Sequence, residues 1–201
     1  VQALAFTPDA GQLYSGSADK TVRQWSMSED KETGRLVTPA EVTALLVSRD
    51  GATLVSAHQD NKLRYWNRDQ VAAPPAEGAE AGEAPQPTRE TGDHSRPVTA
   101  LTPVPGTDEF LAASRDGNVR LYNITNGNQV RTLALGSPVL DVAVTPNGER
   151  VAACGENGVT RIWRRDNGQQ LAEIKGDPEL ARKVASLTDE STVAKNKVSL
   201  R

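Results

Sequence analysis

The sequence is poor in cysteine and in aromatic residues, and it has no long apolar run. One Cys in 201 residues excludes an internal disulfide and any zinc site built from several thiolates. No segment approaches the roughly 18–20 consecutive apolar residues that cross a bilayer, so we expect no membrane insertion. Lys and Arg number 23 against 26 Asp and Glu. The resulting net charge of −3 provides no excess of basic residues for phosphate backbones, and we expect no nucleic-acid partner.

The remaining composition is that of a soluble protein, with 37% hydrophobic and 24% charged residues. It leaves the compartment open between cytoplasm and periplasm. A length of 201 residues is typical of one large domain or two small ones. The chain begins Val-Gln-Ala-Leu, with neither an initiator Met nor a signal peptide, so we interpret it as part of a longer protein.

A repeat organises the chain. Four segments share one pattern: residues 15–25 (SGSADKTVRQW), 56–66 (SAHQDNKLRYW), 112–122 (AASRDGNVRLY) and 153–163 (ACGENGVTRIW). They end on Trp25, Trp66, Tyr122 and Trp163, which lie 41, 56 and 41 residues apart. Because two of the three spacings agree, the simplest interpretation is four units with one local insertion.

Each unit also carries the signals of short antiparallel strands. An alternating apolar segment comes first, at residues 1–6, 42–47, 98–104 and 139–144. Turns rich in Pro, Asp, Asn and Gly follow, at residues 7–11, 48–51, 105–108 and 145–148. Two further strands run through the repeated pattern, and an outer strand is expected at residues 34–38, 128–135 and 169–175. These signals predict an all-β fold, and a period near 41 with four strands is typical of propeller blades.

The four units resemble blades of the WD-repeat β-propeller family, over residues 1–70 and 92–177. That resemblance implies a buried polar relay in each blade, made by a His, a Ser or Thr, an Asp and a Trp. The third unit matches it best, with Tyr in place of Trp: His94, Ser114, Asp116 and Tyr122. The other units carry parts of it: Ser17, Asp19 and Trp25; Asp60 and Trp66; and Trp163. His58 stands at the Ser position of the second unit, and Asn157 replaces Asp in the fourth.

A catalytic triad is the alternative interpretation of His94, Ser114 and Asp116. Such a triad is defined by geometry and role rather than by residue type. The same residue types recur at structural positions of the other units, so we favour the structural interpretation. The lone Cys154 lies in an apolar strand segment, which indicates a buried, inert thiol rather than a nucleophile.

The expected organisation is four blades with one insert and a terminal helix. The boundaries are residues 1–37 for blade 1, 38–70 for blade 2, 71–91 for a disordered insert rich in Ala, Glu and Pro, 92–135 for blade 3, 136–177 for blade 4 and 178–201 for the helix. The insert cannot bury enough apolar surface to offset its ordering entropy, which indicates a solvated loop or a segment that orders on a partner. Propellers of this family commonly close with about seven blades, so we expect the four to belong to a larger ring.

The terminal segment carries helix signals. Asp177, Pro178 and Glu179 form a helix start, and a heptad spacing follows at Leu180, Val184, Leu187, Ser191, Ala194 and Val198. Both a coiled coil and an amphipathic helix laid against the propeller fit this pattern. Gly176 and Asp177 stand where the Gly-His pair of a fifth blade would open, so we expect the helix to begin an insertion between blades, with more blades beyond it. The segment 174–177 (IKGD) before a long helix is similar to large bacterial WD-repeat proteins of the planctomycete type.

The leading functional hypothesis is a non-catalytic scaffold that binds a protein or peptide through a propeller face. The candidate binding face comprises Arg49, His58, Gln59, Arg115, Glu156 and Asn157. A recurring arginine, at positions 23, 64, 120 and 161, either lines a channel or is structural, as a solvated side chain or one paired between blades, and we favour the structural interpretation. Nothing indicates a cofactor, a metal or an enzyme. The alternative is a docking or sensing module of a larger redox (cytochrome-linked) or hydrolase protein. Further partners would be the remaining blades of the parent chain or a second copy.

Overall fold

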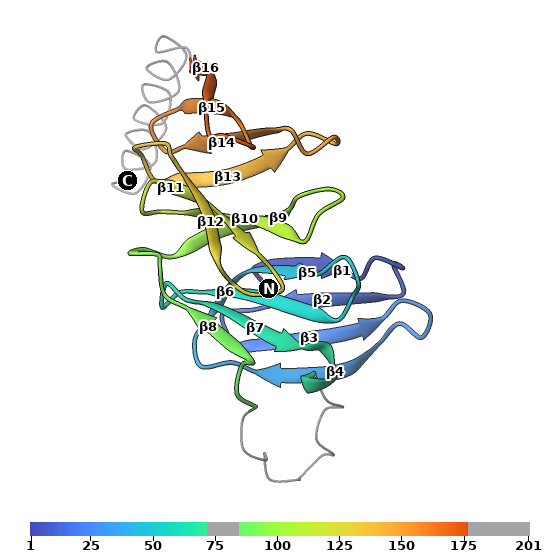
Figure 1. Ribbon diagram of the computed structural model, residues 1–201. Coiled ribbons are helices and arrows are strands. Elements are labelled where there is room, and N and C mark those ends of the chain that lie inside the picture. Colours follow the sequence, from blue (N-terminus) through green and yellow to red (C-terminus); the bar gives the residue numbers. More distant parts are fainter. Residues whose placement is uncertain (72–84, 177–201) are drawn as a thin grey trace, which may run out of the picture.

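The computed structural model describes residues 1–71 and 85–176, which form four antiparallel sheets of four strands each (Figure 1). The strands are β1 (Ala3–Phe6), β2 (Gln12–Gly16), β3 (Thr21–Ser26) and β4 (Lys31–Val37) in blade 1, and β5 (Val42–Val47), β6 (Thr53–His58), β7 (Leu63–Asn67) and β8 (Arg89–Thr91) in blade 2. They continue with β9 (Val98–Pro103), β10 (Glu109–Ser114), β11 (Asn118–Asn123) and β12 (Gln129–Ala134) in blade 3, and β13 (Val139–Val144), β14 (Arg150–Gly155), β15 (Val159–Arg164) and β16 (Gln170–Lys175) in blade 4. A 3-10 turn, η1 (Arg68–Gln70), follows β7. The prediction of an all-β fold with four blades is confirmed.

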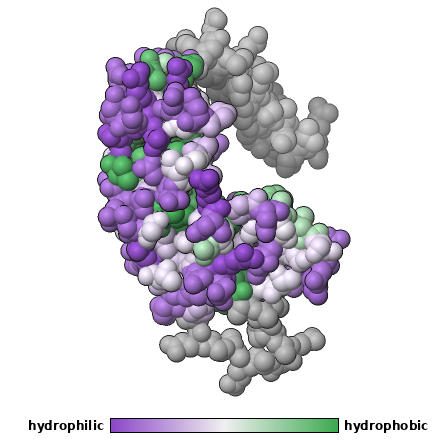
Figure 2. Space-filling model, turned by 45° about the vertical axis from the view of Figure 1, so that its right-hand side comes forward, coloured by the Kyte–Doolittle hydropathy of each residue, from purple (hydrophilic) through white to green (hydrophobic). Residues whose placement is uncertain are grey.

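Within each blade the strands pair in chain order. The first strands, β1, β5, β9 and β13, contact one another in series, so the sheets stack face to face. The stack follows a curve whose concave side is visible in Figure 2. Two threonines of β9 fasten neighbouring blades, because the hydroxyls of Thr99 and Thr102 donate to the carbonyls of Val139 and Val142 at 2.9 and 3.0 Å.

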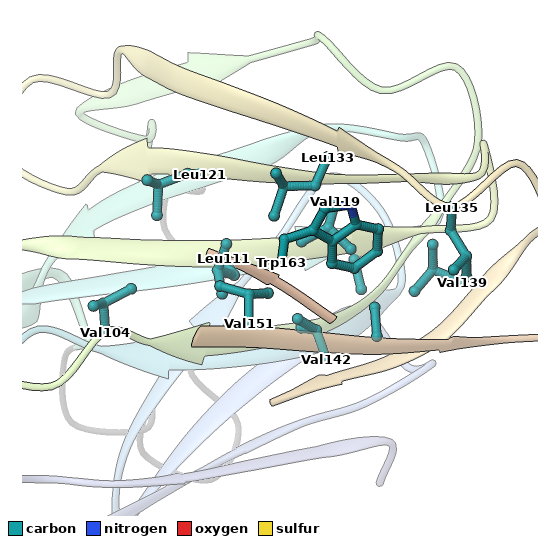
Figure 3. Close-up of a cluster of buried hydrophobic side chains, with 12 residues drawn as sticks. Val104, Leu111, Val119, Leu121, Leu133, Leu135, Val139, Val142, Val151 and Trp163 are labelled. Carbon is teal, nitrogen blue, oxygen red and sulfur yellow. The ribbon is translucent and has the colours of Figure 1, made fainter. Parts of the chain in front are cut away.

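The hydrophobic core lies between the sheets and is divided into three clusters, one at each contact between neighbouring blades. Alternation along each strand explains this, because successive side chains point to opposite faces of a sheet and so towards different neighbours. In blades 2 to 4 the aromatic residue on the third strand faces the preceding blade: Trp66 lies in the cluster with blade 1, Tyr122 in that with blade 2 and Trp163 in that with blade 3. Figure 3 shows Trp163 packed among the aliphatic side chains of the last cluster.

The turn between the second and third strands uses a left-handed residue in every blade. Lys20, Asn61, Gly117 and Gly158 take φ values of 64°, 70°, 89° and 74° there. Glycine adopts this conformation without steric cost, whereas Lys20 adopts it at the cost of a clash between its Cβ and the backbone. Blade 1 differs most from the others, because its positive-φ residues are Ala10, Lys20 and Asp30 and none of them is glycine.

The outer strand of blade 2 corrects one expected boundary. We expected residues 71–91 to be a disordered insert, yet β8 (Arg89–Thr91) lies within it and pairs with β7. Charge rather than apolar burial anchors this strand. Glu90 pairs with Lys62 and, at 2.8 Å, with Arg64, while the Arg89 guanidinium lies 5.5 Å from the centre of the Tyr65 ring. A composition poor in apolar residues does not reveal such an anchor.

Other expectations concern parts of the chain that the structure leaves undescribed. The helix predicted at 178–201, with its heptad, lies outside the described residues, and so does most of the predicted insert. The closure of a larger ring stays a prediction. In the described ranges, no helix has the length and apolar character needed to span a membrane.

Candidate functional site: buried relays and turn rims

The relay of blade 3 joins three of its four expected residues. Arg120 donates to His94 Nδ1 at 2.8 Å, and His94 Nε2 lies 3.2 Å from the Tyr122 hydroxyl, which donates in turn to Asp93 at 3.4 Å. Arg120 also pairs with Asp116 at 2.7 Å, and His94 Nδ1 lies 3.7 Å from that carboxylate. An imidazole that accepts from Arg120 at Nδ1 is neutral. Burial and the Arg120 charge accordingly lower the pKa of His94 from 6.5 to about 4.

Ser114 is not part of this chain of contacts. Its hydroxyl donates to the carbonyl of Arg96 at 2.9 Å and accepts from the amide of Asp116 at 3.1 Å. The side chain is fully buried and shares no hydrogen bond with His94 among the described residues. A nucleophile must be accessible and bonded to its base. The triad interpretation therefore does not fit the geometry, and Ser114 serves the backbone instead.

Blade 2 has a relay that joins the expected Trp66 to Ser56 and His58, two residues that the sequence pattern did not indicate for it. Trp66 Nε1 donates to the Ser56 hydroxyl at 2.7 Å, which lies 2.7 Å from His58 Nε2, while His58 Nδ1 lies 2.9 Å from the carbonyl of Ala40. All three side chains are fully buried. Burial lowers the pKa of His58 from 6.5 to about 4. The assignment of His58 to an exposed binding face is therefore wrong, because its ring closes a buried network.

Blade 1 has the same Trp–Ser hydrogen bond, but to a serine two residues before the expected one. Trp25 Nε1 donates to Ser15 at 2.9 Å, whereas Ser17 accepts from the amide of Asp19 at 3.3 Å and shapes the turn. Ser15 and Ser56 stand ten residues before their tryptophans. Blade 4 has Ala153 at that position, so Trp163 packs in the core of the contact with blade 3.

The turn aspartates hold an arginine of the following strand. Asp19, Asp60 and Asp116 each accept from the amide two residues further on and pair with the arginine four residues further on, at 3.3, 2.6 and 2.7 Å. Burial alone would raise the pKa of Asp116, but the hydrogen bond and charge of Arg120 outweigh it and the net shift is downward. Asn157 carries no charge, and Arg161 pairs with Glu173 at 2.9 Å instead. These pairs support the structural role of the repeated arginine.

The remaining candidate residues separate onto two rims. We call the turns between second and third strands, at residues 17–20, 59–62, 115–117 and 156–158, the Asp-turn rim; the turns between first and second strands form the opposite rim. Gln59, Arg115, Glu156 and Asn157 are exposed on the Asp-turn rim, where Arg115 and Glu156 of neighbouring blades pair at 3.2 Å. Arg49 lies at the other end of its strand pair, since Val47 pairs with Leu54 and Val42 with His58. Its assignment to the same face is wrong.

The opposite rim has a shallow apolar hollow of about 230 Å³ between blades 2 and 3. Pro103, Val104 and Pro105 line one side and Leu46 and Val47 the other. Arg49 and, from blade 1, Pro8 also line it. Sequence analysis missed this hollow because its walls come from segments far apart in the chain.

A comparison with known protein families finds a repeat in each of the four blades. The family model described as "WD domain, G-beta repeat" matches residues 1–26, 32–67, 85–123 and 127–164. The chain belongs to the WD40 family. The four matched segments correspond to the four sheets, so each sheet is a WD40 repeat.

The WD40 relatives include proteins of several organisms. The chain is 25% identical over 176 residues to Transcriptional corepressor LEUNIG_HOMOLOG of Arabidopsis thaliana, covering 85% of this chain and 20% of that protein. It is 24% identical to Transcription initiation factor TFIID subunit 5 of Caenorhabditis elegans (81% and 23% covered) and 27% identical to Protein LST8 homolog of Drosophila melanogaster (81% and 49%). The chain thus spans at most about half of these relatives. The resemblance to planctomycete-type proteins stays a prediction.

Solved structures agree on the WD40 fold. "Structure of U3-55K" superposes with a TM-score of 0.71 at 20% identity, over 88% of this chain and 52% of that one. The crystal structure of RRP9 WD40 repeats superposes equally well, over 87% and 51%. The described part of this WD40 chain has no group of three His, Cys, Asp or Glu side chains placed to hold a metal.

Because of its two buried histidines, we expect the free energy of unfolding of this WD40 chain to depend on pH. Both have pKa values near 4 when folded, against 6.5 when exposed, so their contribution is complete above pH 6.5 and is lost as the pH falls towards 4. Between pH 7 and pH 5 we expect the free energy of unfolding to fall by about 2 kcal/mol for each histidine. Urea unfolding at both pH values measures this. His58→Gln and His94→Gln should each remove about half of the loss, and an unchanged loss in both variants would contradict neutral burial.

Proposed function

We propose that this WD40 chain is a non-catalytic scaffold that binds a protein or peptide through its Asp-turn rim. The proposal rests on the contrast between the polar groups buried inside the blades and those exposed on the rim. His58, His94 and Ser114 are buried and bonded within the blades. The Cys154 thiol, which we expected to be buried, is partly exposed. The polar groups on the rim, by contrast, are exposed and fixed to rigid turns. Such a rim has the character of a docking surface, because loops held by a scaffold expose polar groups at fixed positions.

The relatives support a role in assemblies. One is by name a transcriptional corepressor and another is a subunit of an initiation factor, and each spans several times the length matched by this chain. Four blades that expose charged and amide side chains in series offer a partner several anchoring points. The Arg115–Glu156 pair bridges two blades and would be the centre of the contact.

We expect the double variant Arg115→Ala, Asn157→Ala to weaken partner capture at least about tenfold, since anchor residues at protein interfaces each contribute roughly 2 kcal/mol. The immobilised chain is exposed to lysate, and captured proteins are compared between variants by quantitative mass spectrometry. Arg49→Ala is the matched control, because Arg49 is an exposed turn arginine on the opposite rim. Loss of the same proteins with Arg49→Ala alone would contradict the rim assignment.

We further propose that other blades cover the two ends of the described stack. Leu4 on the outer side of blade 1 is 61% exposed, while its counterpart Leu45 in blade 2 is 6% exposed. Ile174 on the outer side of blade 4 is 56% exposed, against 3% for its counterpart Leu133. The end faces therefore carry interface side chains without a neighbour in the described residues, and a second blade is what covers the same positions inside the stack.

A further inference from the structure

Polar contacts near the opposite rim recur where neighbouring blades meet. The first residue of the second strand in one blade faces the residue that follows the third strand in the next. Gln12 accepts from Arg68 at 2.8 Å between blades 1 and 2, and Glu109 pairs with Arg165 between blades 3 and 4. Thr53 and Ile124 occupy the two positions in the middle contact. In both polar cases the acceptor is on the earlier blade and the arginine on the later one.

The outer face of blade 4 reverses this polarity. Arg150 is the first residue of β14, at the position of Gln12 and Glu109, and its cross-strand partner is Arg164. The corresponding cross-strand partners in the other blades are the neutral Ser26, Asn67 and Asn123. Both arginines are exposed, and they line one hollow of about 260 Å³ together with Glu149, Arg165 and Asp166. Neither Arg150 nor Arg164 forms an ion pair within the described ranges, although these two acidic residues are near. Like charges directly opposite in a sheet are unfavourable, so an anion supplied from outside the blade would stabilise this pair.

Apolar side chains lie on the same face of blade 4 as the arginine pair. Ala152 and Ile162 pair with each other, each two residues from an arginine of the pair on the same strand. Ile174 lies on the outer strand of the blade. Inside the stack, the corresponding positions of blade 3 are held by Leu111, Leu121 and Leu133, which are buried against blade 4. The face therefore combines an apolar area of the kind that receives a blade with two guanidiniums where other blades present an acceptor.

We propose that this face receives a further WD40-type blade carrying a carboxylate directly after its third strand, at the position that Arg68 and Arg165 occupy in this chain. An Asp or Glu there forms charge-assisted hydrogen bonds with Arg150 and Arg164, for which the planar guanidinium is well suited. The inference rests on the proposal that other blades cover the ends of the stack, and it adds the chemistry by which one such blade is recognised.

A second copy of this chain does not meet that requirement. Its own free blade is blade 1, where the residue after the third strand is Met27; its amide donates to the Gly11 carbonyl just as that of Arg165 donates to Glu149. Met27 is 44% exposed. A thioether facing Arg150 leaves a guanidinium buried without an anion, which is costly. The mismatch keeps the two ends of one chain from joining copies head to tail.

The substitution Met27→Glu supplies the missing carboxylate and tests the proposal. Copies of this variant present a carboxylate to Arg150 of the next copy, so we expect self-association at least about tenfold tighter than in Met27→Gln, which adds a neutral side chain of the same shape. Sedimentation velocity over a concentration series gives both dissociation constants. Added NaCl should weaken association of the Met27→Glu chain selectively, and Arg150→Gln, Arg164→Gln in that background should return it to the Met27→Gln level.

A charge-swapped chain provides the second test. Met27→Arg with Arg150→Glu restores the acceptor and donor order seen between blades 3 and 4, and it should associate more tightly than Met27→Arg alone. Equal dissociation constants for Met27→Glu and Met27→Gln would overturn the proposal, and so would wild-type association as tight as that of Met27→Glu. The latter result would leave intact the proposal that blades cover the ends, and neither result bears on the Asp-turn rim. Circular dichroism confirms that each variant is folded.

Discussion

Replacing Trp66 with alanine is expected to lower the free energy of unfolding by about 4 kcal/mol. The indole is fully buried between blades 1 and 2, and its loss leaves a cavity lined by aliphatic side chains. It also removes the donor that bonds to Ser56, so the Ser56 and His58 network loses its end. Urea unfolding at pH 7 gives the change directly. The free energy of unfolding of Trp66→Phe should lie between those of the wild type and Trp66→Ala, since phenylalanine keeps most of the packing but has no N–H to donate.

Trp25 is the matched control for this prediction because it occupies the same position in blade 1. It makes the same bond, to Ser15, but it is only half-buried, since no described blade packs over it. Trp25→Ala should therefore cost about 1–2 kcal/mol in the isolated chain. Equal losses for the two variants would show that burial between blades is not what stabilises Trp66.

Replacing Asp116 with alanine is expected to lower the free energy of unfolding by about 3–5 kcal/mol. The side chain of Asp116 is 2% exposed and accepts from Arg120 and from the amides of Ser95 and Asn118. Its removal leaves the Arg120 charge beside His94 without a counter-ion, and breaking one partner of a buried pair carries a penalty of this size. Thermal and urea unfolding at pH 7 both report it.

Asp19→Ala tests whether burial causes that effect. Asp19 caps the equivalent turn and pairs with Arg23 at 3.3 Å, but its side chain is 47% exposed. Exposed pairs contribute little, so we expect a loss of about 1 kcal/mol or less. The pKa of Asp116 is lowered in the folded chain, so its contribution is present above the unfolded pKa of 3.8 and is lost as the pH falls below it. A loss for Asp19→Ala as large as that for Asp116→Ala would contradict this explanation.

The number of blades and most strand positions could be predicted because they follow from local patterns. Alternating side chains mark strands, and Pro, Gly, Asp and Asn mark turns, so the 41-residue spacing locates both. The outer strand β8 escaped prediction because ion pairs to Lys62 and Arg64 hold it, and these join segments far apart in the chain.

The candidate site was predicted less well, for geometric reasons. A strand position two residues away from the correct one lies on the same face of the sheet, so Ser17 and Ser15 cannot be distinguished by alternation alone. His58 and Ser114 occupy equivalent positions in their blades. Each hydrogen-bonds a backbone carbonyl two residues before the first strand, that of Ala40 or of Arg96. A ring nitrogen and a hydroxyl both make this bond, so the pattern does not distinguish them. Arg49 was misplaced because both kinds of turn have similar residues, and only the strand register separates the rims.

The left-handed residues in the turns of blade 1 have a consequence for how the stack opens. Ala10, Lys20 and Asp30 each hold a conformation that glycine would adopt at lower cost, and the described residues give the same blade a neighbour on one side only. In a linear array, stability is a sum of unit and nearest-neighbour terms, so the unit with strained turns and one interface is the first to detach. Among the four described blades, blade 1 is thus expected to open first, whereas blades 2 and 3 are covered on both faces, and we expect amide exchange to begin in blade 1.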